Sequence, residues 1–391
     1  MLDPQPMSPQ EAARAALHAL WTFPSILFSA FLMAWAAEGA QFYISQGLAL
    51  ALLAWLQTLP EFAVEAVIAW HGDVPLMTAN FTGALRLLTG VGWPMIWIVF
   101  AIFEHRRGET RALPPIHLSR EHAATVAGLA PPLLWFVWII FKGTLDLVDA
   151  GVLLAMYFAY LALLQRIPPS EHEAEADAPQ VVRVVLAWPE PKRLLGVVAL
   201  FLSGGVALFF IATPFLDSMK GVAITMGVSQ FVFVQWVAPF LSEMPEKTSA
   251  FMWAKSRGKA GMALMNMASS NVNQWTVLAA MIPIVYSIAR GEPSAVPVGE
   301  HRVELLLTLL QSALGVVLLA NFRFHAHEAL GLFGLWLAQF LVPHWREEIC
   351  WLYGAWLAFE LLSTLWRPGR LQAFAVLPKL WTEGSRRAAA K

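Results

Sequence analysis

Two short sequences, Gln57-Thr58-Leu59-Pro60-Glu61 and Ser242-Glu243-Met244-Pro245-Glu246, lie inside long apolar segments of this 391-residue chain. A proline removes one backbone hydrogen bond from a helix and tends to break it. Within a membrane, broken backbone is tolerated only where it lies inside the protein. A carboxylate at that depth costs about 3 kcal/mol or more, which favours a functional role. The two sequences therefore predict a pair of interrupted membrane helices that carry a polar centre.

The composition of the whole chain is typical of a membrane protein. Hydrophobic residues make up 58% of the chain and charged residues 14%, whereas about 25% of residues are charged in ordinary soluble proteins. The 26 Lys and Arg residues are balanced by 27 Asp and Glu, so no basic excess exists to bind nucleic acid. The single cysteine, Cys350, excludes an internal disulfide. We therefore expect an all-α integral membrane protein in a lipid bilayer, with no nucleic-acid partner.

Eleven apolar segments are expected to cross the membrane. A helix needs about 20 apolar residues to span a hydrocarbon core of about 30 Å, and these segments reach or approach that length. The second and seventh contain the prolines quoted above, and both are too long for an upright span. The segments are 17–37, 40–70, 76–103, 122–141, 145–165, 194–215, 221–253, 261–289, 303–321, 324–342 and 350–365.

The distribution of Lys and Arg predicts the orientation of these segments. Positive residues concentrate in alternate loops and in the C-terminal tail, and loops of this kind face the cytoplasm. The N-terminus is therefore expected outside and the C-terminus in the cytoplasm, in agreement with an odd number of spans. The positive residues are Arg106, Arg107, Arg111, Arg120, Arg166, Arg183, Lys192, Arg193, Lys255, Arg257, Lys259, Arg367, Arg370, Lys379, Arg386, Arg387 and Lys391.

Three landmarks recur in the two halves of the chain. They are Ser45, Glu61 and Asn80 in the first half and Ser229, Glu246 and Asn266 in the second. Successive landmarks are 16 and 19 positions apart in the first half, and 17 and 20 positions apart in the second. Spacing this similar predicts an internal repeat.

The repeat predicts the architecture. Each copy contains five expected spans, and because five is odd, the second copy must lie upside down relative to the first. Inverted repeats with broken helices at matching positions are typical of secondary transporters, whose site lies near the midplane. We therefore expect an inverted-repeat 5+5 transmembrane helix bundle with broken helices plus one extra C-terminal helix. Its parts are a first repeat, 17–165, a cytoplasmic linker, 166–193, a second repeat, 194–342, and the extra helix, 350–366.

The two proline-containing sequences resemble the Gly-Ser/Thr-Ser-Leu-Pro-Glu signatures of the sodium/calcium exchanger, or cation/Ca2+ antiporter, superfamily. Asn266-Met267-Ala268-Ser269-Ser270-Asn271 is similar to its Gly-Asn-x-x-Gly-Ser-Asn motif, and Asn80-Phe81-Thr82-Gly83 is a weaker copy. The Gly-Ser/Thr-Ser starts are replaced, so the chain resembles a divergent bacterial-type member. The resemblance implies a transporter without a cofactor, not an enzyme, and a location in the bacterial inner membrane.

The resemblance also implies a set of site residues. The two glutamates would bind the transported cation, as metal ligands, and the paired asparagines would complete its shell. The chemistry is suitable, because Ca2+ takes six to eight oxygen ligands from carboxylates, amides and backbone carbonyls. We expect the hydroxyls of Thr58 and Ser242 to contribute as well. The cation-binding residues are thus Glu61, Asn80, Glu246, Asn266, Thr58 and Ser242, supported by Glu243, Lys247, Glu65, Ser270 and Asn271.

The function expected is exchange of Ca2+, or another inorganic cation, for Na+ or H+ by alternating access. Members driven by sodium often carry an aspartate where this chain has Asn266, which favours H+ as the driving ion. Two positive residues, Arg86 and Lys247, argue against Ca2+ because they lie close in sequence to the expected ligands. Lys247 follows Glu243 by four positions, a spacing that favours an ion pair on a helix. The alternatives are a sodium/proton exchanger that does not carry Ca2+, and a membrane scaffold or sensor that has lost transport.

Overall fold

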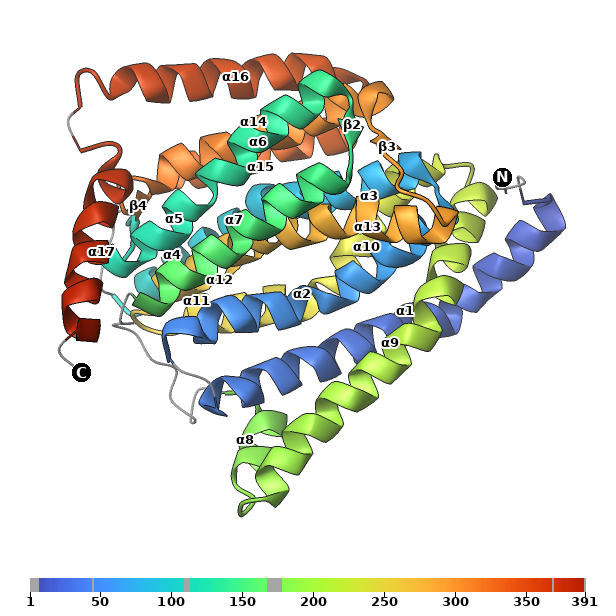
Figure 1. Ribbon diagram of the computed structural model, residues 1–391, viewed down its shortest axis with the longest axis horizontal. Helices are drawn as coiled ribbons and strands as arrows, with labels where there is room; N and C mark the ends of the chain where they lie inside the picture. Colours follow the sequence, from blue (N-terminus) through green and yellow to red (C-terminus); the bar gives the residue numbers. More distant parts are fainter. Residues whose placement is uncertain (1–6, 44–45, 109–112, 167–177, 368, 390–391) are drawn as a thin grey trace.

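A computed structural model describes residues 7–43, 46–108, 113–166, 178–367 and 369–389. Within these residues the chain is almost wholly helical (Figure 1). The α-helices are α1 Pro9–Ala40, α2 Gln46–His71, α3 Val74–Leu87, α4 Trp93–Arg106, α5 Ala123–Gly128, α6 Ala130–Lys142, α7 Leu147–Arg166, α8 Gln180–Leu186, α9 Lys192–Thr225, α10 Gln230–Ser242, α11 Met244–Lys255, α12 Ala260–Asn273, α13 Ala279–Arg290, α14 Arg302–Leu319, α15 Ala326–Leu341, α16 Arg346–Ser363 and α17 Gln372–Ala389. Short π-helical segments are η2 Leu88–Gly92 and η5 Gln274–Leu278. The 3-10 turns are η1 Gln41–Tyr43, η3 Arg120–His122, η6 Gly299–His301 and η7 Pro343–Trp345. The strands are β1 Ile116–His117, β2 Thr144–Leu145, β3 Val296–Pro297 and β4 Arg323–Phe324.

The helices confirm an integral membrane helical bundle. In the described part of the chain, seven helical stretches are long and apolar enough to cross a membrane. Each of the eleven expected segments contains one or more helices, although α9 runs on to Thr225, inside the range expected for the seventh. Two helices were not expected, α8 in the linker and α17 in the basic tail. Residues 167–177 of the linker, like the repeat landmark Ser45, lie outside the described residues.

Proline interrupts one of the two expected helices, not both. Glu243 separates α10 from α11, and Pro245 falls in the first turn of α11, where a proline costs nothing because the N–H there has no helical partner. Helix α2 instead continues through Pro60. The predicted break at Pro60 is therefore wrong: only the hydrogen bond to the carbonyl of Leu56 is lost, and the helical turns on either side hold the backbone together.

Two further features relate the halves of the chain. The π-helical segments η2 and η5 begin at Leu88 and Gln274, the same distance after Asn80 and Asn266. Two antiparallel ribbons join distant loops, β1 with β4 and β2 with β3. If the third to fifth spans correspond to the eighth to tenth, each ribbon maps onto the other. Both features support the 5+5 inverted repeat, which remains our proposal for the arrangement.

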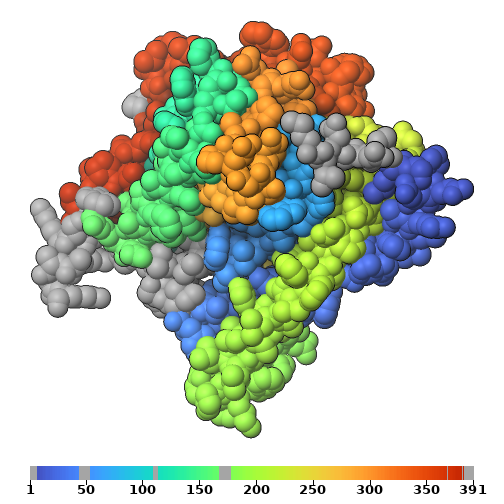
Figure 2. All heavy atoms as spheres, turned by 45° about the vertical axis from the view of Figure 1, so that its right-hand side comes forward, coloured from blue at the N-terminus to red at the C-terminus, as the bar shows by residue number. Residues whose placement is uncertain are grey.

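Helices α1 and α9 form a long pair beside the rest of the bundle, whereas α17 runs across the helix ends (Figure 1). Figure 2 shows α9 on the outer face of the molecule. The exposed side chains of α9 include Leu202, Phe209 and Phe210, which are 58%, 78% and 69% exposed. Large apolar side chains exposed in this way are suited to contact with lipid.

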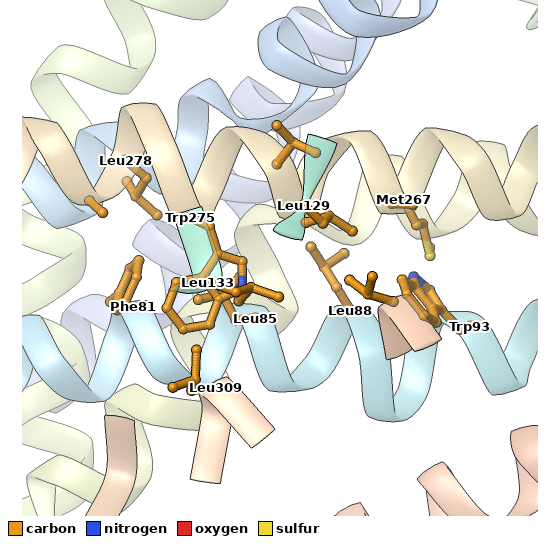
Figure 3. Packing of buried hydrophobic residues seen from close by; sticks show 14 of the residues in the cluster. Phe81, Leu85, Leu88, Trp93, Leu129, Leu133, Met267, Trp275, Leu278 and Leu309 are labelled. Atoms are coloured by element: carbon orange, nitrogen blue, oxygen red, sulfur yellow. The ribbon is translucent and has the colours of Figure 1, made fainter. Parts of the chain in front are cut away.

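One part of the hydrophobic core lies between the helical stretch from α3 to α4 and the stretch from α12 to α13 (Figure 3). The indole of Trp275 packs against the rings of Phe81 and Phe136, with ring centroids 5.5 and 4.5 Å apart. Trp275 adjoins Gln274, and Phe81 adjoins Asn80. These bulky rings therefore fix the two helices at the level where their polar side chains lie.

Gly83 provides a test of the packing between α3 and α10. A Cβ atom at Gly83 would lie 1.8 Å from the carbonyl oxygen of Gln235, whereas one at Gly205 of α9 would meet nothing within 4 Å. Gly83→Ala should therefore destabilise the protein by about 1–3 kcal/mol through overpacking. Gly205→Ala should be neutral or stabilising by up to about 1 kcal/mol, since alanine favours helix. Thermal unfolding in detergent measures both; equal melting temperatures would contradict the close approach.

Candidate functional site

The structure buries every side chain that the sequence predicted for the site. All eleven are at most 6% exposed, and Glu61, Glu65, Glu243 and Glu246 have no exposed surface. They come from α2, α3 and α12 and from the junction of α10 with α11. The charges of Glu65, Glu243 and Glu246 all act on Glu61. The four carboxyl groups therefore form one electrostatic centre, which we call the carboxylate centre.

A chain of hydrogen bonds connects three charged groups of this centre. The side-chain amide of Gln274 donates to Glu61 Oε2 at 2.6 Å and to Glu243 Oε1 at 2.8 Å. The second oxygen of Glu243 accepts from Lys247 Nζ at 2.5 Å. The expected pairing of Glu243 with Lys247 is thus present, and Gln274 joins this ion pair to Glu61.

The remaining acids each have one polar partner. Ser270 Oγ donates to Glu246 Oε1 at 2.6 Å. Asn80 Nδ2 donates to Glu65 Oε2 at 2.7 Å. Asn266, by contrast, donates to the side-chain oxygen of Gln57 at 3.2 Å and to no acid among the described residues. The two asparagines are therefore placed differently, one beside a carboxylate and the other beside an amide.

Helical periodicity explains why these side chains meet. Asn266, Ser270 and Gln274 recur every fourth residue along α12 and into η5, and Glu61 and Glu65 have the same spacing in α2. Residues four apart lie on one face of a helix. One polar face of α12 and η5 thus lies against one polar face of α2.

Among the described residues, several buried oxygen atoms of the centre and of the adjoining α12 and η5 have no hydrogen-bond partner. Buried polar atoms are nearly always paired in proteins, so a cluster of unpaired acceptors needs an explanation. The atoms are Glu61 Oε1, Glu65 Oε1, Asn80 Oδ1, Glu246 Oε2, Asn266 Oδ1, Asn271 Oδ1, Asn273 Oδ1 and Gln274 Oε1. Carboxylate and amide oxygens are the donors that hard cations such as Ca2+ require, so this set is suited to binding a cation.

The two predicted hydroxyl ligands are bonded to their own helices. Thr58 Oγ1 donates to the carbonyl of Trp55 at 2.9 Å, and Ser242 Oγ donates to that of Ala238 at 3.0 Å. Among the described residues, no three His, Cys, Asp or Glu side chains converge as in a resident metal site. Two acids and neighbouring amide oxygens are therefore the most that this conformation offers to one ion.

Arg86 belongs to a different cluster. Its guanidinium donates to Glu304 Oε2 at 2.6 Å and to Gln339 Oε1 at 2.9 Å, and it lies 5.2 Å from the ring centroid of Trp236. Arg346 of α16 bonds the other oxygen of Glu304 at 2.5 Å. The concern that Arg86 would repel a divalent ion is therefore removed, because its charge is compensated by Glu304.

Two residues that contact the predicted site residues, Gln57 and Gln274, were not predicted from the sequence. Both are at most 1% exposed. Gln57 stands in the first proline-containing sequence, and Gln274 continues the four-residue spacing of Asn266 and Ser270. Both signals were present in the sequence. The position in the first half that matches Gln274 is Leu88, so the repeat did not predict a polar residue there.

Comparison with known proteins gives a family match and a fold match. The family model described as sodium/calcium exchanger protein matches residues 15–165 and 196–343. The solved structure of the H+/Ca2+ exchanger CAX is similar with a TM-score of 0.85 at 28% identity, over 94% of this chain and 92% of that one. A structure of the sodium-calcium exchanger NCX_Mj, soaked with Na+ and Sr2+, has a TM-score of 0.55 at 16% identity over 86% and 99% of the two chains, a likeness in fold alone. No curated protein matches the chain.

The Glu243–Lys247 pair makes a prediction about stability. Removing one member of a buried ion pair leaves an uncompensated charge and costs about 3–5 kcal/mol, whereas removing both can be nearly neutral. Lys247→Met should therefore lower the melting temperature in buffer of low salt concentration, and Glu243→Gln combined with Lys247→Met should largely restore it. Thermal unfolding of the purified proteins measures the effect. If the single variant were as stable as the wild type, the pair would not hold the junction of α10 and α11.

Proposed function

This chain belongs to the sodium/calcium exchanger family, whose members are ion transporters and not enzymes, and from that membership we propose that it exchanges Ca2+ for H+ by alternating access. The observation that carries the proposal is the cluster of buried, unpaired oxygen atoms around Glu61 and Glu246. The likeness to an H+/Ca2+ exchanger, at 28% identity over nearly the whole chain, favours this pair of ions.

The binding step uses the oxygens of both halves of the chain. Glu61 of α2 and Glu246 of α11 supply two negative charges, enough to neutralise one Ca2+. Asn80 and Asn266 supply amide oxygens that are unpaired in the structure. Ca2+ tolerates six to eight oxygen ligands in a flexible arrangement, so water and backbone carbonyls complete the shell.

The exchange step follows from burial. A carboxyl group that loses its cation in a low-dielectric interior is more stable with a proton than without one. Ca2+ and H+ therefore compete for the same oxygens, and the centre is occupied by one or the other as it faces each side in turn. The two inverted repeats, 17–165 and 194–342, would provide the two states. The proposed orientation places the N-terminus outside and the C-terminus in the cytoplasm, in the inner membrane of a bacterium.

A second candidate, exchange of Na+ for H+ without Ca2+ transport, is favoured by one observation. The ammonium of Lys247 acts electrostatically on Glu246, and this reduces the negative charge available to a divalent ion. The two candidates differ in cargo but use the same residues.

Flux measurements distinguish these candidates. In proteoliposomes with an imposed proton gradient, uptake of labelled Ca2+ is expected, whereas an equal sodium gradient should drive little. Proton-driven movement of labelled Na+ with no Ca2+ movement would support the second candidate. Absence of any cation flux would reject both and leave a membrane protein that has lost transport.

Two charge-removing variants test the centre itself. Glu61→Gln and Glu246→Gln keep size and polarity but each remove one negative charge, so each should reduce Ca2+ flux by about 100-fold or more, as the loss of a charged ligand costs several kcal/mol. Glu292→Gln, at a residue whose side chain is 68% exposed, is the matched control and should transport normally. Transport at the wild-type rate by either centre variant would reject the site assignment.

A further inference from the structure

The two halves of the carboxylate centre differ in charge. Aligned on Glu61 and Glu246, the first half has Thr58 and Phe62 where the second has Glu243 and Lys247. Each half supplies two carboxylates, because Glu65 of the first half aligns with Ala250 of the second. The second half carries one additional ammonium, Lys247, four residues after Glu243. No other acid of the centre has a basic partner among the described residues.

The additional ion pair lies within the centre and not beside it. Lys247 is 6% exposed, and its Nζ lies 2.5 Å from Glu243 Oε2. The other oxygen of Glu243 shares the Gln274 amide with Glu61. Glu243, which holds the Lys247 ammonium, is thus two hydrogen bonds away from the proposed ligand Glu61, and the charge of Lys247 acts on Glu246.

Stability alone does not explain a pair in this position. Replacing a buried ion pair with apolar residues is often neutral or stabilising, and the repeat supplies such an alternative in Thr58 and Phe62. The Arg86–Glu304 pair is different, because Arg346 and Gln339 also contact it and the cluster joins four helices, α3, α14, α15 and α16. Within the described part of the chain, the side chains of the Glu243–Lys247 pair make their other hydrogen bond to Gln274, so the pair is connected to the centre and to no peripheral helix.

We propose that the ammonium of Lys247 is a tethered cation that permanently fills the cation subsite of Glu243. In this proposal, which rests on the proposed exchange function, each cycle moves one external positive charge fewer than the carboxylates alone would require. Without the ammonium, the subsite would take up a small monovalent cation, H+, Na+ or K+, as the fourth carboxylate of the centre.

The coupling ratio tests this proposal. In proteoliposomes, the reversal potential of Ca2+ flux under set proton and Na+ gradients gives the number of monovalent cations exchanged per Ca2+. Lys247→Met should raise this number by one and make transport correspondingly more sensitive to voltage. Lys247→Arg, which keeps the charge, and the double variant Glu243→Gln with Lys247→Met, which removes both charges, should keep the wild-type ratio. A folded Lys247→Met protein with an unchanged ratio and unchanged voltage dependence would overturn the proposal.

Binding measurements cover the case in which Lys247→Met does not fold in the liposome. Melting temperatures in detergent are measured at increasing concentrations of H+, Na+ or K+, with a large organic cation as the control. A small monovalent cation should stabilise Lys247→Met but not the double variant. Glu243→Gln alone frees the ammonium to act on Glu246, so Ca2+ affinity should fall on the order of tenfold or more, and the double variant should recover it. Unchanged Ca2+ affinity in Glu243→Gln would overturn the proposal.

The two proposals fail differently. If the wild type exchanges no cations under any gradient, the proposed function is rejected, while the melting-temperature titration still reports whether Glu243 takes up a monovalent cation when Lys247 is absent. If the wild type exchanges cations and Lys247→Met retains the wild-type ratio, only the tethered cation is rejected.

Discussion

The constraint that governs this protein is the burial of four carboxyl groups in one low-dielectric centre. Glu61, Glu65, Glu243 and Glu246 have no exposed surface, and like charges so placed repel one another strongly. The amide of Gln274, which donates to both Glu61 and Glu243, satisfies part of this requirement, and Lys247 compensates one charge. Among the described residues, a group of carboxylate and amide oxygens in the centre is left without hydrogen-bond partners, and the proposed binding of an external cation depends on these oxygens.

The backbone around the centre is adapted to the same requirement. The junction of α10 and α11 at Glu243 and the π-helical segment at Gln274 both depart from regular helix where the polar side chains are needed. Such π segments recur at functional sites because they change the direction in which side chains point. The corresponding segment η2 in the first half begins with Leu88. The two halves therefore share a π-helical segment, but its first residue is apolar in the first half and polar in the second.

A second cluster of buried charged residues attaches the C-terminal helices to the bundle. Glu304 of α14 lies between Arg86 of α3 and Arg346 of α16, so its second ion pair attaches α16 to the bundle. This gives α16 a structural role. Arg370, just before α17, bonds Glu360 of α16 in a similar manner, which attaches the C-terminal helix in turn.

The sequence by itself determined the helical membrane class and the burial of the site residues, because hydropathy and intramembrane charge are local properties that no later contact reverses. It also identified the Glu243–Lys247 pair, which depends only on spacing within one helical region. It was wrong about the break at Pro60, since a helix can continue past one missing hydrogen bond. Helix α17 was not predicted, because a basic amphipathic segment forms a stable helix only where it packs against a partner surface. The partners of Gln274, Arg86 and Asn266 were decided by the tertiary structure alone, because a hydrogen bond between residues about 200 positions apart depends on which helix faces come together and not on any local pattern.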